Sequence, residues 1–209
     1  MLYLASASPR RRDLLKLAGF RFTVEPAEID EVMSQDDPAC LVQNLALKKA
    51  RAVAKLHPDD VVLAADTVVA LDNHILGKPQ DKEQAQKMLR MLSNRVHQVY
   101  TGYCILKQNR CEIGVSCTSV EFYPLSDEDI ESYIATGEPF DKAGGYGIQS
   151  LGSLLVRKTT EISTMWSVYP LRKSAACSAP SALQKLQKNR TMEKRVQRCN
   201  IFAETVPMF

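Results

Sequence analysis

Polar and basic residues with a capacity for anion binding lie near the start of the chain, where residues 6–12 read Ser-Ala-Ser-Pro-Arg-Arg-Arg. Ser8 is a good helix N-cap and Pro9 a typical first helical residue, so a helix should begin here with free backbone N–H groups. These groups, together with the guanidinium groups of Arg10 and Arg11, suit phosphate oxygens. The alternative is a capped helix with solvated arginines, although positive charge at a helix start opposes the helix dipole.

A single carboxylate, Asp66, interrupts the otherwise apolar run VVLAADTVVAL at 61–71. Burying a carboxylate is costly unless the group is paired or ligated, so Asp66 needs a partner. If the chain reversed at the end of a strand near Asp66, the side chain would lie at a cleft mouth. There it could bind a metal ion or take a proton from water. The competing interpretation is an aspartate that caps a turn between two short strands.

Lysines and one more carboxylate supply the remaining groups that a triphosphate and its magnesium ion require. Lys48 and Lys49 lie in a predicted helix, and plain solvation is the better interpretation for Lys48. Lys78 stands in the rigid turn Gly-Lys-Pro, which indicates a fixed position. Glu31, in the string EIDE, is the additional carboxylate.

The segment GGYGIQ at 144–149 is dense in glycine, which lets a backbone approach a ligand closely. Gln149 at its end carries both a donor and an acceptor and could read the edge of a base. As an isolated pattern this signal is weak, because glycine-rich loops are common.

The elements that would position these residues follow from hydrophobic periodicity and from capping residues. Helices are expected at 9–18, 41–56, 81–92 and 126–135. Strands are expected at 2–5, 20–24, 61–71 and 154–157, and a hairpin at 96–107 and 111–123. Strands and helices alternate early and a β-meander follows, which predicts an α/β or mixed-sheet fold.

Composition excludes several classes of protein. The 209 residues are 45% hydrophobic with a formal net charge of +3, typical of a globular protein and too weakly basic to indicate nucleic-acid binding. Six cysteines show no C-x-x-C pair and three histidines lack zinc spacing, which favours free thiols and no structural zinc. No stretch has the length or apolarity of a membrane span or signal peptide, so we expect a cytoplasmic protein.

Seven motifs in order resemble the Maf family of nucleotide pyrophosphatases over residues 1 to about 157. They are ASASPRR, EIDE, KKA, AADTVV, GKP, TGY at 101–103, and EPFDKAGGYGIQ. The resemblance implies an α/β fold of the Maf/ITPase-like type, with an elongated mixed β-sheet flanked by helices and two lobes around a central cleft. It also implies cleavage between the α- and β-phosphates with a divalent cation, Mg²⁺ or Mn²⁺, as cofactor.

The family's functional positions transfer to this chain by motif. Asp66 is similar to the catalytic proton acceptor, and the positions that set base preference are Arg10, Thr67 and Gln149. The phosphate-binding positions are Ser8, Arg11, Lys49 and Lys78, and the metal-binding positions are Glu31 and Asp66. If Asp66 is a metal ligand it cannot freely be the base, and the sequence leaves that choice open.

Thr67 and DKAGGYGIQ are similar to the branch of the family that acts on dTTP and UTP, so a nucleoside triphosphate is the expected partner. Modified pyrimidine nucleotides are further candidates, and they suggest a housekeeping role in the nucleotide pool. Neither nucleic acid nor a membrane is expected as a partner, and the choice between monomer and homodimer stays open. The alternative function is a catalytically impaired nucleotide-binding or interaction protein.

The C-terminal segment departs from the family, which divides the chain into a Maf-like domain at 1–158 and a divergent tail at 159–209. No regular strand or amphipathic helix is evident from Lys158 until a basic stretch at 184–198. The string EISTMWSVYPL at 161–171 can be encoded by codons that, read from the third base, give DFYNVVGLPL, which resembles the family's continuation. The hypothesis is therefore a tail translated out of frame and poorly ordered, which would weaken the fold.

Overall fold

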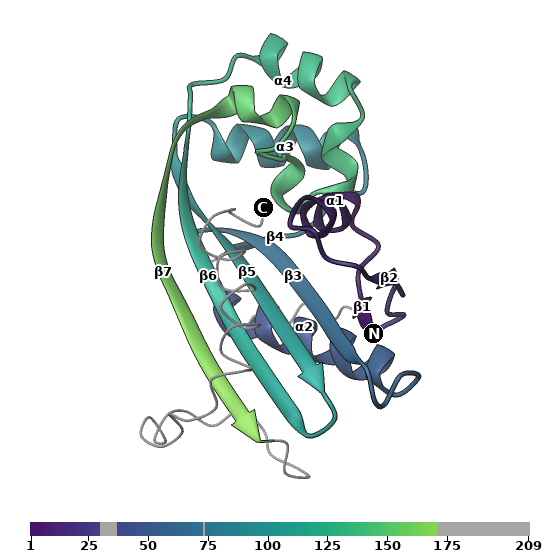
Figure 1. Cartoon of the computed structure of the whole chain (residues 1–209). Helices are drawn as coiled ribbons and strands as arrows, with labels where there is room; N and C mark the ends of the chain where they lie inside the picture. Colours follow the sequence, from purple (N-terminus) through teal and green to yellow (C-terminus); the bar gives the residue numbers. More distant parts are fainter. Residues whose placement is uncertain (30–36, 73, 171–209) are drawn as a thin grey trace.

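The computed structural model describes residues 1–29, 37–72 and 74–170, with residues 161–170 described by their backbone. In this part of the chain, seven strands form one mixed sheet in the order β2-β1-β3-β5-β6-β7, and β4 pairs with β3 (Figure 1). The strands are β1 (Leu2–Leu4), β2 (Thr23–Val24), β3 (Val61–Leu71), β4 (His74–Leu76), β5 (Val96–Lys107), β6 (Arg110–Phe122) and β7 (Val156–Pro170). β1 pairs in parallel with β2 and β3, while the other pairs are antiparallel, which confirms the mixed α/β fold.

Four α-helices accompany the sheet among the described residues: α1 (Pro9–Leu17), α2 (Pro38–Ala54), α3 (Lys82–Leu92) and α4 (Asp127–Ala135). Their starts follow from the capping residues. Asp37 and Asp81 accept hydrogen bonds from backbone N–H groups at the starts of α2 and α3, and Ser126 forms a capping box with Asp129. α2 begins earlier than the predicted position 41, because Asp37 caps a helix whose first residue is a proline. None of the described helices combines the length and apolarity needed to cross a lipid bilayer.

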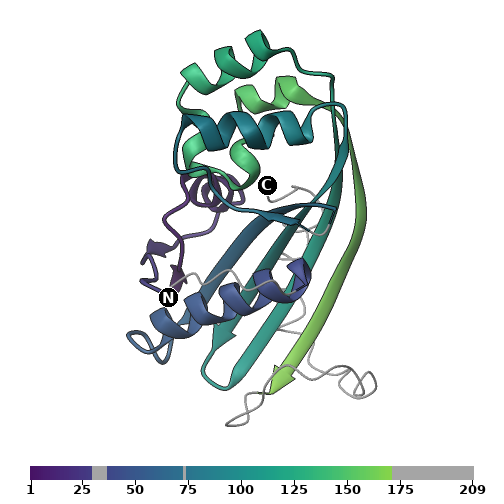
Figure 2. The same cartoon turned by 180° about the vertical axis from the view of Figure 1, so that it is seen from behind.

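The molecule has two lobes, as predicted, and three clusters of buried apolar residues fill them. In one lobe, α3, α4 and three short 3-10 helices (Glu138–Asp141, Ala143–Gly145 and Leu151–Leu155) gather at one end of the sheet (Figure 1). Its core includes Leu89, Phe122, Ile130 and Tyr133. In the other, α2 lies across one face of the sheet, which is seen best from behind (Figure 2). Its core includes Ala46, Val53, Val62 and Cys104.

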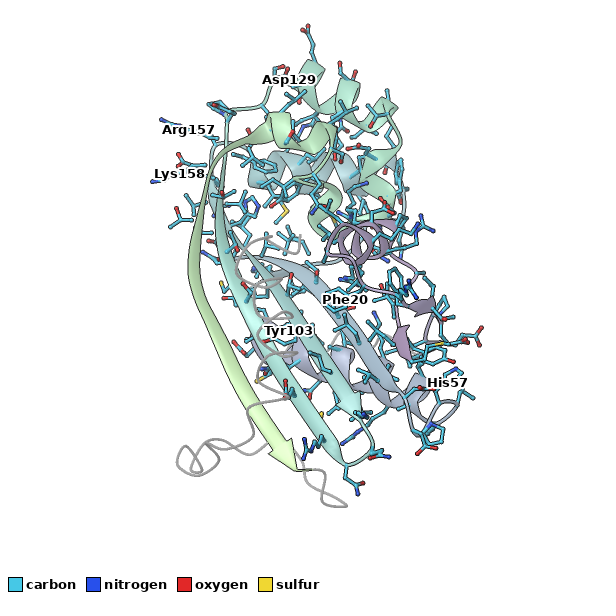
Figure 3. The ribbon with its side chains drawn as sticks, in the orientation of Figure 1. Phe20, His57, Tyr103, Asp129, Arg157 and Lys158 are labelled. Atoms are coloured by element: carbon cyan, nitrogen blue, oxygen red, sulfur yellow. The ribbon has the colours of Figure 1, made fainter. Side chains whose placement is uncertain are left out.

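β7 corrects one expectation about the C-terminal segment. The sequence predicted no regular element directly after Lys158, yet the backbone continues as a strand to Pro170, antiparallel to β6. At its start Arg157 pairs with Glu121 at 3.2 Å, and Arg157 and Lys158 project outward from the sheet (Figure 3). A ladder of backbone hydrogen bonds does not require an amphipathic sequence, and periodicity therefore missed this strand. The expectations for residues 171–209 lie outside the described residues.

An opening in the sheet lies beside the middle of β3. β1 pairs with residues 61–63 of β3, and β4 pairs with residues 69–71 on that same edge. Among the described residues, no strand pairs with residues 64–68 on this edge, while β5 pairs along the whole opposite edge. Asp66 and Thr67 therefore lie where the sheet is open, in the middle of a strand.

Candidate active site

A cavity of about 480 Å³ occupies this opening, between the two lobes. The turn after β1 and the start of α1 form one side, α2 contributes Leu45 and Lys49, and β3 contributes residues 66–69. The turn after β4 and the loop after α4 complete the wall with Gly77, Lys78, Asp141, Ala143, Tyr146 and Ile148. The cavity therefore joins segments from both lobes, and it matches the central cleft expected from the sequence.

Asp66 and Lys49 form a buried ion pair at the base of the cavity. Lys49 Nζ donates to Asp66 Oδ1 at 2.5 Å, and the two residues are 9% and 8% exposed. Asp66 Oδ2 has no hydrogen-bond partner among the described residues, and the side chain lines the cavity. A buried carboxylate must be paired, and Lys49 is the partner that the sequence required for Asp66.

Gly102 lets α2 approach the sheet closely enough for this pair to form. It lies opposite Asp66 in the β3–β5 register, and a Cβ built on it would be 2.4 Å from the backbone carbonyl carbon of Val42 in α2. That separation is impossible for a real side chain, so the helix backbone packs directly against β5. Lys49 follows Val42 by two helical turns and thus lies on the same face of α2.

Asp66 differs from both sequence-based interpretations of its place. It neither ends a strand nor caps a turn, because β3 continues without a break from Val61 to Leu71. Its access to the cavity comes instead from the edge beside residues 64–68, which none of the described strands pairs. Single-sequence patterns do not reveal which edge of a strand is unpaired, and the prediction of a chain reversal was therefore wrong.

Arg11 of α1 forms hydrogen bonds with β3 beside the residues that no described strand pairs. One terminal nitrogen of its guanidinium group donates to the Ala65 carbonyl at 3.0 Å and to Ser6 Oγ at 3.1 Å, and the other donates to Thr67 Oγ1 at 3.0 Å. Thr67 Oγ1 also lies 3.1 Å from Thr101 Oγ1 of β5. The sequence predicted a phosphate-binding arginine here, and the structure shows a guanidinium group held in place by several hydrogen bonds.

The other predicted site residues fall into three groups. Ser8, Arg10 and Lys78 line the cavity together with Arg11, Lys49, Asp66 and Thr67. Gln149 is exposed and does not line the cavity, although its neighbour Ile148 does. Glu31 lies outside the described residues.

Ser8 is the N-cap residue of α1, as predicted, but its side chain makes no capping hydrogen bond. Its backbone N–H instead donates to Ser6 Oγ at 3.3 Å. Lys48, by contrast with Lys49, is exposed, in agreement with its interpretation as a solvated lysine.

Asp141 is a cavity-lining carboxylate that sequence reasoning did not select. Lys142, which is buried, donates from Nζ to Asp141 Oδ1 at 2.6 Å and to the Glu138 carbonyl at 2.8 Å. Burial raises the pKa of Asp141, but Lys142 and Arg10 outweigh it and leave that pKa below its usual value. Its position in EPFDKAGGYGIQ, one of the motifs that resemble the family, is the signal that could have identified it.

The charges around the cavity suit a polyanion that carries a metal ion. Arg10, Lys78 and the start of α1 offer positive charge, while Asp66 and Asp141 offer carboxylate oxygens. The described residues contain no cluster of three or more His, Cys, Asp or Glu side chains placed to hold a metal. Mg²⁺ usually binds through one or two carboxylates together with substrate phosphates, so the residues present fit such an ion.

Comparison with known proteins identifies relatives over the same part of the chain. The model of the family described as "Maf-like protein" matches residues 1–165. A dTTP/UTP pyrophosphatase of Halalkalibacterium halodurans is 49% identical over 158 residues, which are 75% of this chain and 83% of the relative. Proteins of the same name from Carboxydothermus hydrogenoformans and Bacillus pumilus are 49% and 48% identical over 75% of this chain, covering 86% and 84% of their own lengths. The family match ends well before residue 209, in agreement with a divergent C-terminal segment.

Proposed function

The chain belongs to the Maf-like protein family, and on that premise we propose that it hydrolyses dTTP and UTP to the monophosphate and pyrophosphate. The observation that carries this proposal is the Lys49–Asp66 pair at the open edge of β3, facing the basic start of α1 across one cavity. Relatives named dTTP/UTP pyrophosphatase favour turnover over a purely nucleotide-binding role. Modified pyrimidine triphosphates are further candidate substrates, with nucleotide-pool housekeeping as the role.

Positive groups from α1 and from the turn after β4 would bind the triphosphate. Arg10 lies in the first turn of α1, whose backbone N–H groups also favour an anion, and Lys78 lies in the turn after β4. Ser8 lines the cavity beside them and offers a hydroxyl group. Arg11 is already oriented by Ser6, Ala65 and Thr67, so it can stabilise developing negative charge without first being reorganised.

Asp66 is the residue we assign to activation of the attacking water. Its Oδ1 is held by Lys49, which leaves Oδ2 to accept a proton from a water molecule in the cavity. Water would then attack the α-phosphorus, and pyrophosphate would leave towards Arg11, Lys49 and Lys78. Because Lys49 fixes the carboxylate, the base would be aligned before substrate arrives.

A divalent cation, Mg²⁺ or Mn²⁺, would be held by Asp66, by Glu31 and by phosphate oxygens. When bound, it supplies charge neutralisation and polarisation at the reacting phosphorus. Asp66 cannot freely serve as ligand and base through the same oxygen, and we assign Oδ2 to the proton.

Base preference is assigned to Arg10, Thr67 and Gln149. Thr67 faces the cavity while its hydroxyl group is engaged by Arg11 and Thr101, so it would act mainly through shape. Gln149 is exposed beside the cavity-lining Ile148, and its amide group carries the donor and the acceptor that recognition of a base edge requires.

The test is release of pyrophosphate from a panel of triphosphates that includes dTTP, UTP, dCTP, ATP, GTP and 7-methyl-GTP, with and without Mg²⁺ or Mn²⁺. The proposal predicts metal-dependent release, fastest with dTTP or UTP, and loss of turnover in Asp66→Asn. Preference for 7-methyl-GTP would contradict the substrate class, and nucleotide binding without turnover would contradict the activity.

A further inference from the structure

A fully buried histidine lies behind the cavity wall and takes no part in the chemistry described above. His97, near the start of β5, is 0% exposed, and its Nε2 lies 2.6 Å from the hydroxyl oxygen of Tyr146. Phe122 packs edge-on against both rings, with centroid distances of 5.0 Å to His97 and 4.7 Å to Tyr146. The hydrogen bond therefore lies against the ring of Phe122 in the core of the helical lobe.

Both members of this bond are neutral near pH 7. Burial lowers the pKa of His97 to about 4, and burial raises the pKa of Tyr146 above its usual value. Nδ1 of His97 has no hydrogen-bond partner among the described residues. Within this part of the chain, the imidazole ring is therefore hydrogen-bonded through Nε2 to Tyr146. Apolar side chains at both positions would fill this space without leaving either partner of the bond unsatisfied, which indicates that the bond serves another purpose.

Tyr146 belongs to the loop that forms one wall of the cavity. Gly144 and Gly145 both have positive φ, at 68° and 75°, and they turn the chain so that Tyr146 points into the core of the helical lobe. The Gly144 N–H donates to the Gly77 carbonyl at 2.9 Å, next to Lys78. Ala143, Tyr146 and Ile148 line the cavity, so a shift of this loop would change its shape.

We propose that His97 is a positioning residue whose bond to Tyr146 holds the loop at 143–148 in place as the nucleotide-binding wall. The inference rests on the proposed function for its substrate, a pyrimidine nucleoside triphosphate. Lys49, Asp66 and Arg11 lie on α2, β3 and α1, so loosening the loop leaves these three groups in place and affects Lys78 alone, through the Gly144–Gly77 bond. The effect is therefore on KM for the triphosphate much more than on kcat.

The test compares Tyr146→Phe and His97→Leu, which remove the bond, with His97→Gln, which keeps a polar group at a similar reach. KM should rise about three- to tenfold in the first two variants, the worth of one hydrogen bond, with kcat within about twofold. In His97→Gln, KM should remain near the wild-type value. Tyr103→Phe is the matched control and should show wild-type KM, because this buried tyrosine of β5, labelled in Figure 3, is not among the residues that line the cavity.

Hydrogen exchange of the Gly144 amide provides a second readout that needs no activity. Exchange should accelerate in Tyr146→Phe and His97→Leu, because the bond to Gly77 opens when the loop loosens. If the wild-type chain released no pyrophosphate, the proposed function would fail, and exchange would still decide the role of His97. Unchanged exchange at Gly144 together with wild-type KM in Tyr146→Phe overturns the inference, even if the melting temperature falls.

Discussion

Lys49 of α2 and Asp66 of β3 are joined by a buried ion pair, with Nζ and Oδ1 2.5 Å apart, at the one edge of β3 that the described strands leave open. The pair links the helix of one lobe to the strand that runs beside the cavity. It also explains how an aspartate can lie within an apolar strand, since the lysine satisfies its charge.

The first prediction concerns this pair. Lys49→Met should lower kcat by about 10²- to 10³-fold, because it removes a cation from the leaving group and frees the Asp66 carboxylate from its fixed geometry. Lys48→Met is the matched control, since Lys48 is the exposed neighbour on the same helix and should keep wild-type kinetics. Steady-state pyrophosphate release measures both variants. Equal losses in the two would contradict a specific role for Lys49.

Gly102→Ala should impair catalysis without removing any functional group. The added Cβ would collide with the Val42 backbone and push α2 away from β3, which lengthens the distance between Lys49 and Asp66. A displacement on the order of 1 Å at a catalytic group can cost about a hundredfold in rate, and kcat is the quantity to measure.

Gly114→Ala is the control for that variant. Its added Cβ would meet the side chain of Tyr103 in place of a helix backbone, so it strains the neighbouring strand without moving α2. The two variants should differ in kcat even if both are less stable than the wild type. An unchanged kcat in Gly102→Ala, or an equal loss of kcat in both variants, would contradict the prediction.

Protonation of His97 should make the protein less stable in acid. The pKa of His97 falls from 6.5 to about 4 through burial, so below pH 6.5 the unfolded chain binds a proton that the folded chain excludes. The free energy of unfolding therefore has its full value above pH 6.5, and it falls by roughly 3 kcal/mol as the pH is lowered from 6.5 to 4. Urea unfolding at several pH values should show a steeper decline in the wild type than in His97→Gln. Parallel curves would contradict the assignment.

Much of the fold could be predicted because local signals agree with tertiary structure. The apolar run at 61–71 is β3 with the predicted bounds, and Asp81 and Ser126 cap the predicted helices. The hairpin of β5 and β6 also follows its alternating pattern closely. At these places the capping residue or the periodicity of the sequence is sufficient to define the element.

Contacts between distant segments could not be predicted in the same way. That Lys49 faces Asp66 depends on the crossing of α2 over β5 at Gly102, and that Arg11 reaches the Ala65 carbonyl depends on which edge of β3 is unpaired. The bond between His97 and Tyr146 joins residues 49 positions apart and has no local signature. The site residues could be predicted from the family resemblance, whereas their hydrogen-bond partners could be identified only from the structure.

The reading frame of the tail provides a further prediction. If the residues after about Lys158 are translated out of frame, the coding DNA permits codons that give DFYNVVGLPL when read from the third base of codon 161. A chain with that frame restored should melt at least about 5 °C higher, because it regains apolar packing on the sheet. The boundary at 158 stays a prediction until then, and a coding sequence incompatible with those codons would remove it.

The most direct test of the central claim is hydrolysis of UTP in water labelled with heavy oxygen, followed by mass spectrometry of both products. Activation of water by Asp66 for attack at the α-phosphorus predicts one labelled oxygen in UMP and none in pyrophosphate. Label in pyrophosphate, or release of UDP and inorganic phosphate, would contradict the account.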